Sequence, residues 1–378
     1  MNAHVPVEAQ VEESFEIVAS DARLAEIGSA WTTLWCRSNG LIFQGHDWIS
    51  AWWATVPGRE RRQLRIGLIW RGEDLVAIVP LAIQRRKGMR FLEWAANDCS
   101  DYADILLDPR CVREALSRLW KKLVSEGGFD LYFLNRLRPN AVFRAIIDGP
   151  DGPRLLANHR QEVCSQVAGD WQSGTQWFEA QSKKTRQNYR RGRRALEAGN
   201  VVFRLLPSGE PMAPVLARLA ELKRKWLVHN ARESALFDEG SPALLALVQV
   251  LAAAGVLRIF VLEYDGAVIA ISVNFVQRGT LMAFLTTYDP DFERGSPGMV
   301  LLMDYVQWSI DQGLSMVDFL CGEEPFKQKF ATRSVTLTSV MGARTPKGML
   351  AMLADHCRQA LRSKMEARRT QPAAVLVE

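Results

Sequence analysis

The sequence predicts an α/β fold made of two similar lobes in tandem, each a mixed, mostly antiparallel sheet flanked by helices. The chain has 378 residues, enough for two domains of ordinary size, because a domain commonly holds about 100–200 residues. Strand-like and helix-like segments alternate along the chain, and both halves run from helices to a β-meander and then to a strand–helix–strand unit. We expect lobes at 15–165 and 166–345, followed by a basic helix and flexible tail at 346–378.

In the first lobe, tryptophans recur at helical spacing and turn residues separate the strands. Trp48, Trp52 and Trp53 share one helical stretch, and the Gly127-Gly128 pair ends the next one. The expected elements are a helix at 43–56, strands at 64–70, 75–83 and 103–107, a helix at 112–126, and a strand at 131–135.

In the second lobe, tight turns join three strands into a meander. The turns Asp265-Gly266 and Arg278-Gly279 lie between apolar runs, and Gly313 ends a helix that Gly298 opens. The expected elements are helices at 174–198, 212–229, 242–254 and 299–312, strands at 201–206, 257–263, 268–276, 281–287, 315–320 and 335–340, and a last helix at 350–365.

Composition excludes several classes of protein. Hydrophobic residues make up 48%, charged residues 24%, and the net charge is +5, which rules out a largely disordered chain and permits an anionic ligand without demanding nucleic acid. The six cysteines form no C-x-x-C pair and the histidines lack metal spacing, so we expect no metal and no disulfide framework. The longest apolar run, 242–257, is too short to cross a membrane. We expect a cytoplasmic protein with a loose leader at 1–14, and the oligomeric state stays open.

The first candidate site is the loop at 289–298, which leads from a strand into a helix. A helix N-terminus presents unpaired N–H groups and a positive dipole, which suit a pyrophosphate, and glycine allows close approach of the backbone. The alternative is a loop that only caps the helix. Neither a P-loop nor a G-x-G-x-x-G pattern occurs. The expected cofactor-binding residues are Arg294, Gly295, Ser296, Gly298 and Met299.

The second candidate site is the segment at 318–330. Asp318 lies near a strand end, Gly322 breaks the strand, and Lys327 follows next to Phe326. A lysine placed in this way can direct its charge at a phosphate or at a developing oxyanion. The alternative is a solvated loop in which Asp318 caps backbone groups.

The third candidate is a basic run in which seven Lys or Arg residues fall within 183–194 without an acid. Its field is strongly positive, so Lys183, Arg186 and Arg190 are candidates for contact with coenzyme phosphates or RNA, RNA being the less favoured. A solvated basic face is the alternative.

Polar residues also interrupt the meander. Ser272 and Asn274 alternate with apolar residues, and Thr286 and Tyr288 share a face of the next strand. Such residues line a cleft or meet buried partners. Neither H-E-x-x-H nor G-x-S-x-G occurs, so hydrolases of those two types lack support.

These motifs together resemble the GNAT-superfamily acyltransferases of the cellulose-biosynthesis (CelD/BcsL) type, which are related to FemAB-like peptidyltransferases. The resemblance covers about residues 40–340 and is more specific in the second lobe. The segments that carry it are FQGHDW (43–48), IVPL (78–81), DYAD (101–104), SKKTRQNYRR (182–191), VIA (268–270), SPG (296–298) and DFLCGEEPFK (318–327).

The resemblance implies a tandem GNAT fold and acyl transfer from acyl-CoA, such as acetyl-CoA, to an amine or hydroxyl, with a link to polysaccharide biosynthesis. It implies that Lys327 lies near the reacting carbonyl. For the chemistry of such a transfer we expect that Lys327 stabilises the carbonyl or a phosphate, that Asp318 orients the nucleophile or accepts its proton, and that Tyr288 protonates the leaving thiolate. Ser272, Asn274 and Phe326 are the expected substrate contacts, together with the basic residues of the third candidate. No metal is implied.

The chain departs from the family at the coenzyme loop, which usually reads [QR]-x-x-G-x-[GA], because Pro297 stands three residues after Arg294. Two alternatives therefore stay open. One is a non-catalytic GNAT-like scaffold that binds RNA or a synthase complex, and the other is an aminoacyl-tRNA-dependent ligase.

Overall fold

The computed structural model divides the chain into two compact units. It describes residues 12–111, 113–147, 156–207, 209–231, 234–322 and 325–370, so most of the expected leader at 1–14 lies outside the described residues. The first unit comprises the residues up to 50, residues 58–161 and the residues from 337 onwards. The second unit comprises residues 51–57 and 162–336.

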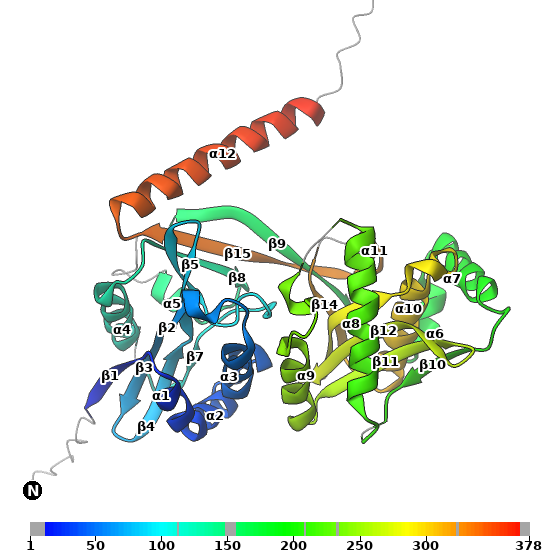
Figure 1. The fold of residues 1–378 in the computed structure, drawn as a ribbon, viewed down its shortest axis with the longest axis horizontal. Helices are drawn as coiled ribbons and strands as arrows, with labels where there is room; N and C mark the ends of the chain where they lie inside the picture. Colours follow the sequence, from blue (N-terminus) through cyan, green and yellow to red (C-terminus); the bar gives the residue numbers. More distant parts are fainter. Residues whose placement is uncertain are drawn as a thin grey trace, which may run out of the picture. The chain divides into compact units, whose positions relative to one another are not determined.

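The first unit contains two sheets and several helices (Figure 1). Its elements are β1 (Glu13–Val18), α1 (Asp21–Glu26), α2 (Gly28–Arg37), α3 (His46–Thr55, up to residue 50), β2 (Arg62–Leu64), β3 (Ile66–Arg71), β4 (Asp74–Val79), β5 (Leu81–Arg86), β6 (Met89–Trp94), β7 (Leu106–Leu107), α4 (Arg113–Glu126), β8 (Leu131–Leu137), α5 (Arg144–Ile147), β15 (Arg333–Ala343, from residue 337) and α12 (Pro346–Thr370).

One sheet of this unit has the order β1-β3-β4-β7, and the strands β2-β5-β6-β8 follow one another in the other. In the second of these, β5 and β6 are antiparallel, whereas β6 and β8 are parallel. Helix α4 buries Leu116, Leu119, Trp120 and Leu123 in the core. This spacing places all four side chains on one face of the helix.

The second unit is built on a twisted sheet with helices on its faces (Figure 1). Its elements are β9 (Leu156–Ala168, from residue 162), α6 (Gly174–Ala180), α7 (Lys183–Ala195), β10 (Val201–Leu205), α8 (Met212–His229), α9 (Ala243–Ala253), β11 (Leu257–Tyr264), β12 (Ala267–Gln277), β13 (Thr280–Tyr288), the 3₁₀ helix η4 (Pro290–Gly295), α10 (Pro297–Asp311), β14 (Met316–Cys321) and α11 (Pro325–Phe330).

The strand order of this sheet is β10-β11-β12-β13-β14-β9. The expected meander forms β11, β12 and β13, and β13 then pairs with β14 in parallel. Two cores cover the sheet, one containing α10 and the other containing α8 and α9. The predicted fold class, mixed α/β with mostly antiparallel strands, is confirmed.

The structure differs from the expected elements at several places. The strand expected at 75–83 is two strands, β4 and β5, which join different sheets at Pro80, a residue without an N–H for the ladder. The helix expected at 174–198 is α6 and α7, separated at Ser182, whose hydroxyl caps α7 by accepting from the N–H of Thr185. The strands β1, β6 and β9 and the helices α1, α2 and α5 were not expected.

The division between the units also differs from the expected one. The predicted second lobe ended at residue 345, but the chain from 337 on belongs to the first unit, because β15 pairs with β8 there. Helix α12 follows in the same unit, where a Cβ at Gly348 would lie 2.1 Å from the Asp130 carbonyl oxygen. The terminal helix therefore begins in close contact with the first unit.

Candidate active site

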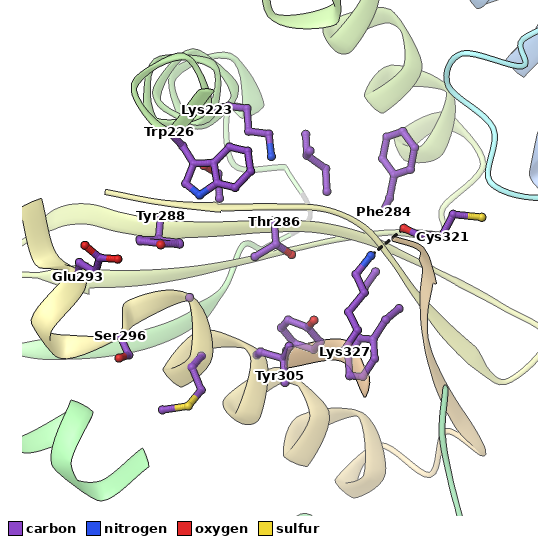
Figure 2. Close-up of a pocket in the computed structure, with 17 residues that line it drawn as sticks. Lys223, Trp226, Phe284, Thr286, Tyr288, Glu293, Ser296, Tyr305, Cys321 and Lys327 are labelled. Carbon is purple, nitrogen blue, oxygen red and sulfur yellow. Dashed lines mark hydrogen bonds between the residues drawn. The ribbon is translucent and has the colours of Figure 1, made fainter. Parts of the chain in front are cut away.

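Two parallel strands of the second unit separate and leave a cavity between them. β13 and β14 pair only from Thr280↔Met316 to Met282↔Asp318. β13 then continues to Tyr288, and a bulge shifts its register with β12 after Asn274↔Ala283. The cavity measures about 360 Å³, within the ordinary range of ligand sites, and is lined by residues of α8, β13, α10, β14 and α11 (Figure 2).

The N-terminus of α10 forms one end of this cavity. Ser296 adopts a left-handed conformation with φ of 49°, and Pro297 occupies the first helical position. Gly298 follows against the ring of Tyr288, where an added Cβ would lie 2.9 Å from Cδ1. The absence of a side chain at Gly298 therefore lets the helix start close to β13, with its positive dipole end at the cavity.

Lys327 lies at the other end of the cavity. Its Nζ donates a hydrogen bond to the Cys321 carbonyl oxygen at 2.7 Å, as Figure 2 shows. Cys321 and Lys327 both line the cavity. The ammonium group is thereby fixed to the end of β14 while it faces the space between the strands.

Asp318 holds the backbone next to Cys321, the residue whose carbonyl accepts the hydrogen bond from Lys327. Its Oδ1 accepts from the Leu320 N–H at 2.8 Å and its Oδ2 accepts from Gln166 Nε2 at 2.7 Å. Leu320 has a φ of 56°, and the ladder between β14 and β9 shifts by one residue between Asp318 and Cys321. Asp318 therefore stabilises a β-bulge that directs Cys321 and its carbonyl.

A buried chain of polar groups reaches the cavity wall. Ser272 Oγ lies 3.0 Å from Asn274 Oδ1 and 2.8 Å from Thr286 Oγ1. Burial raises the pKa of the Tyr305 phenol, and hydrogen bonding to Thr286 and Ser272 offsets part of that rise. Thr286 and Tyr305 line the cavity, so Ser272 and Asn274 support it from behind.

Helix α8 supplies the opposite wall. Lys223 Nζ lies 4.2 Å from the ring centroid of Trp226, and Figure 2 shows both across β13 from Tyr305.

Burial raises the pKa of Tyr288, and the nearby Glu293 raises it further. The Tyr288 phenol is therefore protonated at neutral pH.

Ion pairs tie α8 to the end of β13. Lys225 Nζ lies 2.6 Å from Asp289 Oδ1, and an Arg218 guanidinium nitrogen lies 3.2 Å from Asp289 Oδ2. Burial is the largest single influence on the pKa of Asp289 and would raise it, but the hydrogen bonds from Lys225 and the Asp291 N–H, together with the charges of Lys225 and Arg218, lower that pKa overall. This network fixes the helix that carries Lys223 and Trp226.

The cavity brings together five of the predicted site residues: Tyr288, Ser296, Gly298, Met299 and Lys327. The carboxylate of Asp318 is 2% exposed and engaged with backbone and Gln166, so its position does not support contact with a nucleophile. It supports the alternative that this side chain caps backbone groups. Ser272 and Asn274 are fully buried and do not touch the cavity.

The remaining predicted residues lie elsewhere. Gly295 is buried against α7, where an added Cβ would meet Leu196 at 2.5 Å, and Arg294 is exposed. The side chain of Phe326 lies outside the described residues. Lys183 and Arg190 are exposed on α7 and Arg186 is partly exposed, and these three do not line the cavity.

Helix α7 contacts the rest of the unit through its less basic side. The Tyr189 hydroxyl donates to Asp304 Oδ1 on α10 at 2.6 Å, and Arg193 lies 3.5 Å from Asp304 Oδ2. Burial raises the pKa of Asp304. The exposed basic residues therefore face away from this docking contact, as the solvated-face alternative expects.

Sequence reasoning missed Lys223, Trp226, Glu293, Tyr305 and Cys321. Helices α8 and α10 carry three of these residues, and α10 is buried on most sides, so hydrophobic periodicity does not indicate which side faces a cavity. In the described part of the chain, no group of three or more His, Cys, Asp or Glu side chains is placed to hold a metal ion. None of the described helices is long and apolar enough to span a membrane.

Comparison with known proteins assigns a class to this unit. Residues 183–328 match the family model described as an acetyltransferase (GNAT) domain. No curated protein matches the chain significantly. Most of the second unit is therefore similar to an acetyltransferase (GNAT) domain, and the cavity lies within the matched segment.

Solved structures resemble the chain over most of its length. L-PGS from Bacillus licheniformis is 12% identical, with a TM-score of 0.54 and coverage of 89% of this chain and 96% of that chain. FemX is 9% identical, with a TM-score of 0.54 and coverage of 86% and 96%. A tandem GNAT protein from the clavulanic acid biosynthesis pathway is 10% identical, with a TM-score of 0.51 and coverage of 88% and 99%. These likenesses show that the chain has the fold of a tandem GNAT protein.

Proposed function

We propose that the protein transfers an acyl group from acyl-CoA to an amine or hydroxyl of a small acceptor, in the cavity between β13 and β14. The observation that carries this proposal is the separation of these two strands after Met282 and Asp318, inside the segment that matches the GNAT domain. An extended ligand can add to the backbone of β13 where β14 no longer pairs with it.

The residues present fit such a donor. Thr287 Oγ1 is buried in the cavity wall with no hydrogen-bond partner among the described residues, so a ligand could satisfy it. The N-terminus of α10 suits an anionic phosphate, and Gly298 keeps its first turn open to close approach.

When bound, acyl-CoA supplies an activated thioester. Transfer forms the bond from the acceptor nitrogen or oxygen to the carbonyl carbon and breaks the carbon–sulfur bond. The acceptor loses one N–H or O–H proton and the leaving thiolate gains one, so no net proton is released. Lys327 is held by Cys321 at the cavity, where its charge can stabilise the carbonyl oxygen as negative charge develops. Tyr288, protonated at neutral pH, is the proposed proton donor to the leaving sulfur.

The acceptor is proposed from the resemblance alone. A donor with a short acyl chain, such as acetyl-CoA, and an acceptor linked to polysaccharide biosynthesis are the finer parts of the proposal. Amino sugars and sugar hydroxyls are therefore the acceptors to screen first, by release of thiol from acetyl-CoA.

The decisive test compares ligands for stabilisation of the folded protein. A ligand that binds only the folded state raises the apparent melting temperature by mass action. Acetyl-CoA and longer acyl-CoAs should raise it, and tRNA should not. Stabilisation by tRNA alone would favour the aminoacyl-tRNA-dependent ligase, and no shift with any of them would favour a non-catalytic scaffold.

A further inference from the structure

The end of the cavity beside Lys327 contains a pair of cysteines on neighbouring strands. Cys164 of β9 and Cys321 of β14 are partners in the antiparallel ladder, and their sulfur atoms lie 3.4 Å apart. Both are thiols in the structure. We propose that Cys164 and Cys321 form a redox-active dithiol that a small-molecule disulfide converts to an intramolecular disulfide.

The bulge at Asp318 is what places the two cysteines opposite each other. Asp318 pairs with Gln166. Cys321 lies three residues after Asp318 and Cys164 lies two residues before Gln166, so the extra residue in β14 brings the two cysteines opposite each other. Antiparallel partners have Cα atoms about 4.5–5.5 Å apart, which lies within the range that a disulfide spans. The backbone therefore needs little movement to accept the bond.

The two thiols have different access to reagents. Cys321 lines the cavity and is partly exposed, whereas Cys164 is fully buried. The Cys321 thiol donates a weak hydrogen bond to Glu162 Oε2, with a sulfur–oxygen distance of 3.9 Å. This asymmetry makes Cys321 the thiol that meets an incoming reagent and Cys164 the thiol that resolves the product.

The proposed reaction has two thiol–disulfide exchange steps. The Cys321 thiolate attacks a small disulfide such as glutathione disulfide, forming a mixed disulfide and releasing one glutathione thiolate. The Cys164 thiolate then attacks the Cys321 sulfur and releases the second glutathione. The two cysteines are oxidised, glutathione disulfide is reduced, and the two protons lost by the cysteines go to the released thiolates.

The position of the pair connects it with the cavity. The Cys321 carbonyl is the acceptor that holds Lys327, and the disulfide would draw the sulfurs from 3.4 Å to about 2.05 Å. Oxidation therefore acts on the strand end that anchors Lys327, and any cavity ligand that depends on this lysine should respond to it.

The test uses the full chain with its two exposed cysteines, Cys36 and Cys357, replaced by serine, so that intermolecular bridges do not interfere. This protein is treated with excess glutathione disulfide and analysed by intact mass and peptide mapping. Burial raises the pKa of Cys111 to about 12 and the pKa of Cys99 well above its usual range. These two thiols should react slowly and serve as internal controls.

We expect the protein to lose two hydrogens and to yield a Cys164–Cys321 linked peptide, which dithiothreitol reverses. Cys164→Ser should instead keep one glutathionyl group on Cys321, because the resolving thiol is gone. Cys321→Ser should leave Cys164 unmodified. A lasting glutathionyl group on Cys321 when Cys164 is present, or no reaction at Cys321, would overturn the proposal. Circular dichroism of each serine variant checks that the fold is retained.

Discussion

Both units contain a hairpin, a helix and a strand that pairs in parallel with the second strand of the hairpin, but the described residues occupy the space between these two parallel strands differently in the two units. In the first unit, β6 and β8 pair at Phe91↔Leu131 and Leu92↔Tyr132. Trp94 then bridges the two strands, because its indole N–H donates to the Asn135 carbonyl at 3.0 Å. In the second unit, β13 and β14 separate around the cavity.

The side chains at the strand ends account for this difference. Trp94 is 3% exposed and packs edge-on against Phe143 with ring centroids 5.2 Å apart. The end of β13 instead carries Thr286 and Tyr288, which line the cavity. The same local topology therefore gives a packed core where Trp94 bridges the two strands and a candidate site where Thr286 and Tyr288 border a cavity.

Trp94→Ala should produce the largest change in stability. Removing a buried tryptophan leaves a cavity and costs about 3–5 kcal/mol of unfolding free energy. Trp226→Ala, at a cavity wall in the second unit, should cost less because its ring already borders open space. Urea unfolding of the two variants measures both values, and an equal loss would contradict the comparison.

Lys327→Ala should cause the largest change in activity. Losing a donor that stabilises the developing oxyanion typically lowers the rate by about 10²–10³. Lys329→Ala, on the same short helix but outside the cavity, is the matched control and should change the rate less than about threefold, since surface substitutions usually alter energies by about 0.5 kcal/mol. Thiol release from acyl-CoA measures both. A Lys327→Ala enzyme that keeps more than about a third of the rate would refute the assignment.

Substitutions at two aspartates that follow strands, Asp108 and Asp289, should affect the unfolding free energy and the acyl-CoA affinity differently. Arg110 holds the pKa of Asp108 at about 2, so the stability from this pair is present above pH 4 and is lost as the pH falls towards 2. Asp108→Asn should cost about 0.5–1 kcal/mol at pH 7, because Arg110 is half exposed and screened. The difference in unfolding free energy between Asp108→Asn and wild type, measured by urea unfolding, should become smaller below pH 4.

Asp289→Asn should weaken acyl-CoA binding, whereas Asp108→Asn should not, because Asp289 fixes the helix that carries Lys223 and Trp226. Isothermal titration of both aspartate variants tests this contrast. Equal affinity in the two would show that the ion pairs at Asp289 do not position the cavity wall.

Charge removal on α7 should have the smallest effect. Arg190, Arg191 and Arg194 are exposed and do not line the cavity, so replacing all three by glutamine should leave acyl-CoA affinity within about twofold. We expect tRNA binding at the background level at low salt. Tight tRNA binding whose salt slope falls by about one unit per lost arginine would support the ligase alternative instead.

Much of the second unit could be predicted because its signals are local. Turns such as Asp265-Gly266 define the meander, and the site residues Ser296, Gly298 and Lys327 belong to short continuous motifs. The wall formed by α8 could not be predicted, because Lys225 reaches Asp289 only in the folded chain. Backbone capping by Asp318 was one of two alternatives that the sequence left open, and the bulge that turns its carboxylate towards the Leu320 N–H favours it only in the folded chain.

The first unit was harder to predict. Pro80 breaks an apolar run that reads as one strand, and the pairing of β15 with β8 joins segments about two hundred residues apart. Such long-range pairing leaves no local pattern in the sequence. The hydrogen bond by which Trp94 bridges β6 and β8 likewise depends on Asn135, a residue of another strand.

Binding of acyl-CoA to a glycine series at the start of α10 tests the central claim most directly. A Cβ at Gly298 would lie 2.9 Å from the Tyr288 ring, so the ring or the first turn of α10 must shift; Gly298→Ala should weaken binding and Gly298→Val should abolish it, and circular dichroism of the unliganded variants checks that the fold is retained. Titration calorimetry with acetyl-CoA gives the dissociation constants. An affinity for acetyl-CoA that is the same in wild type and in Gly298→Val would place the donor outside the cavity between β13 and β14 and contradict the account.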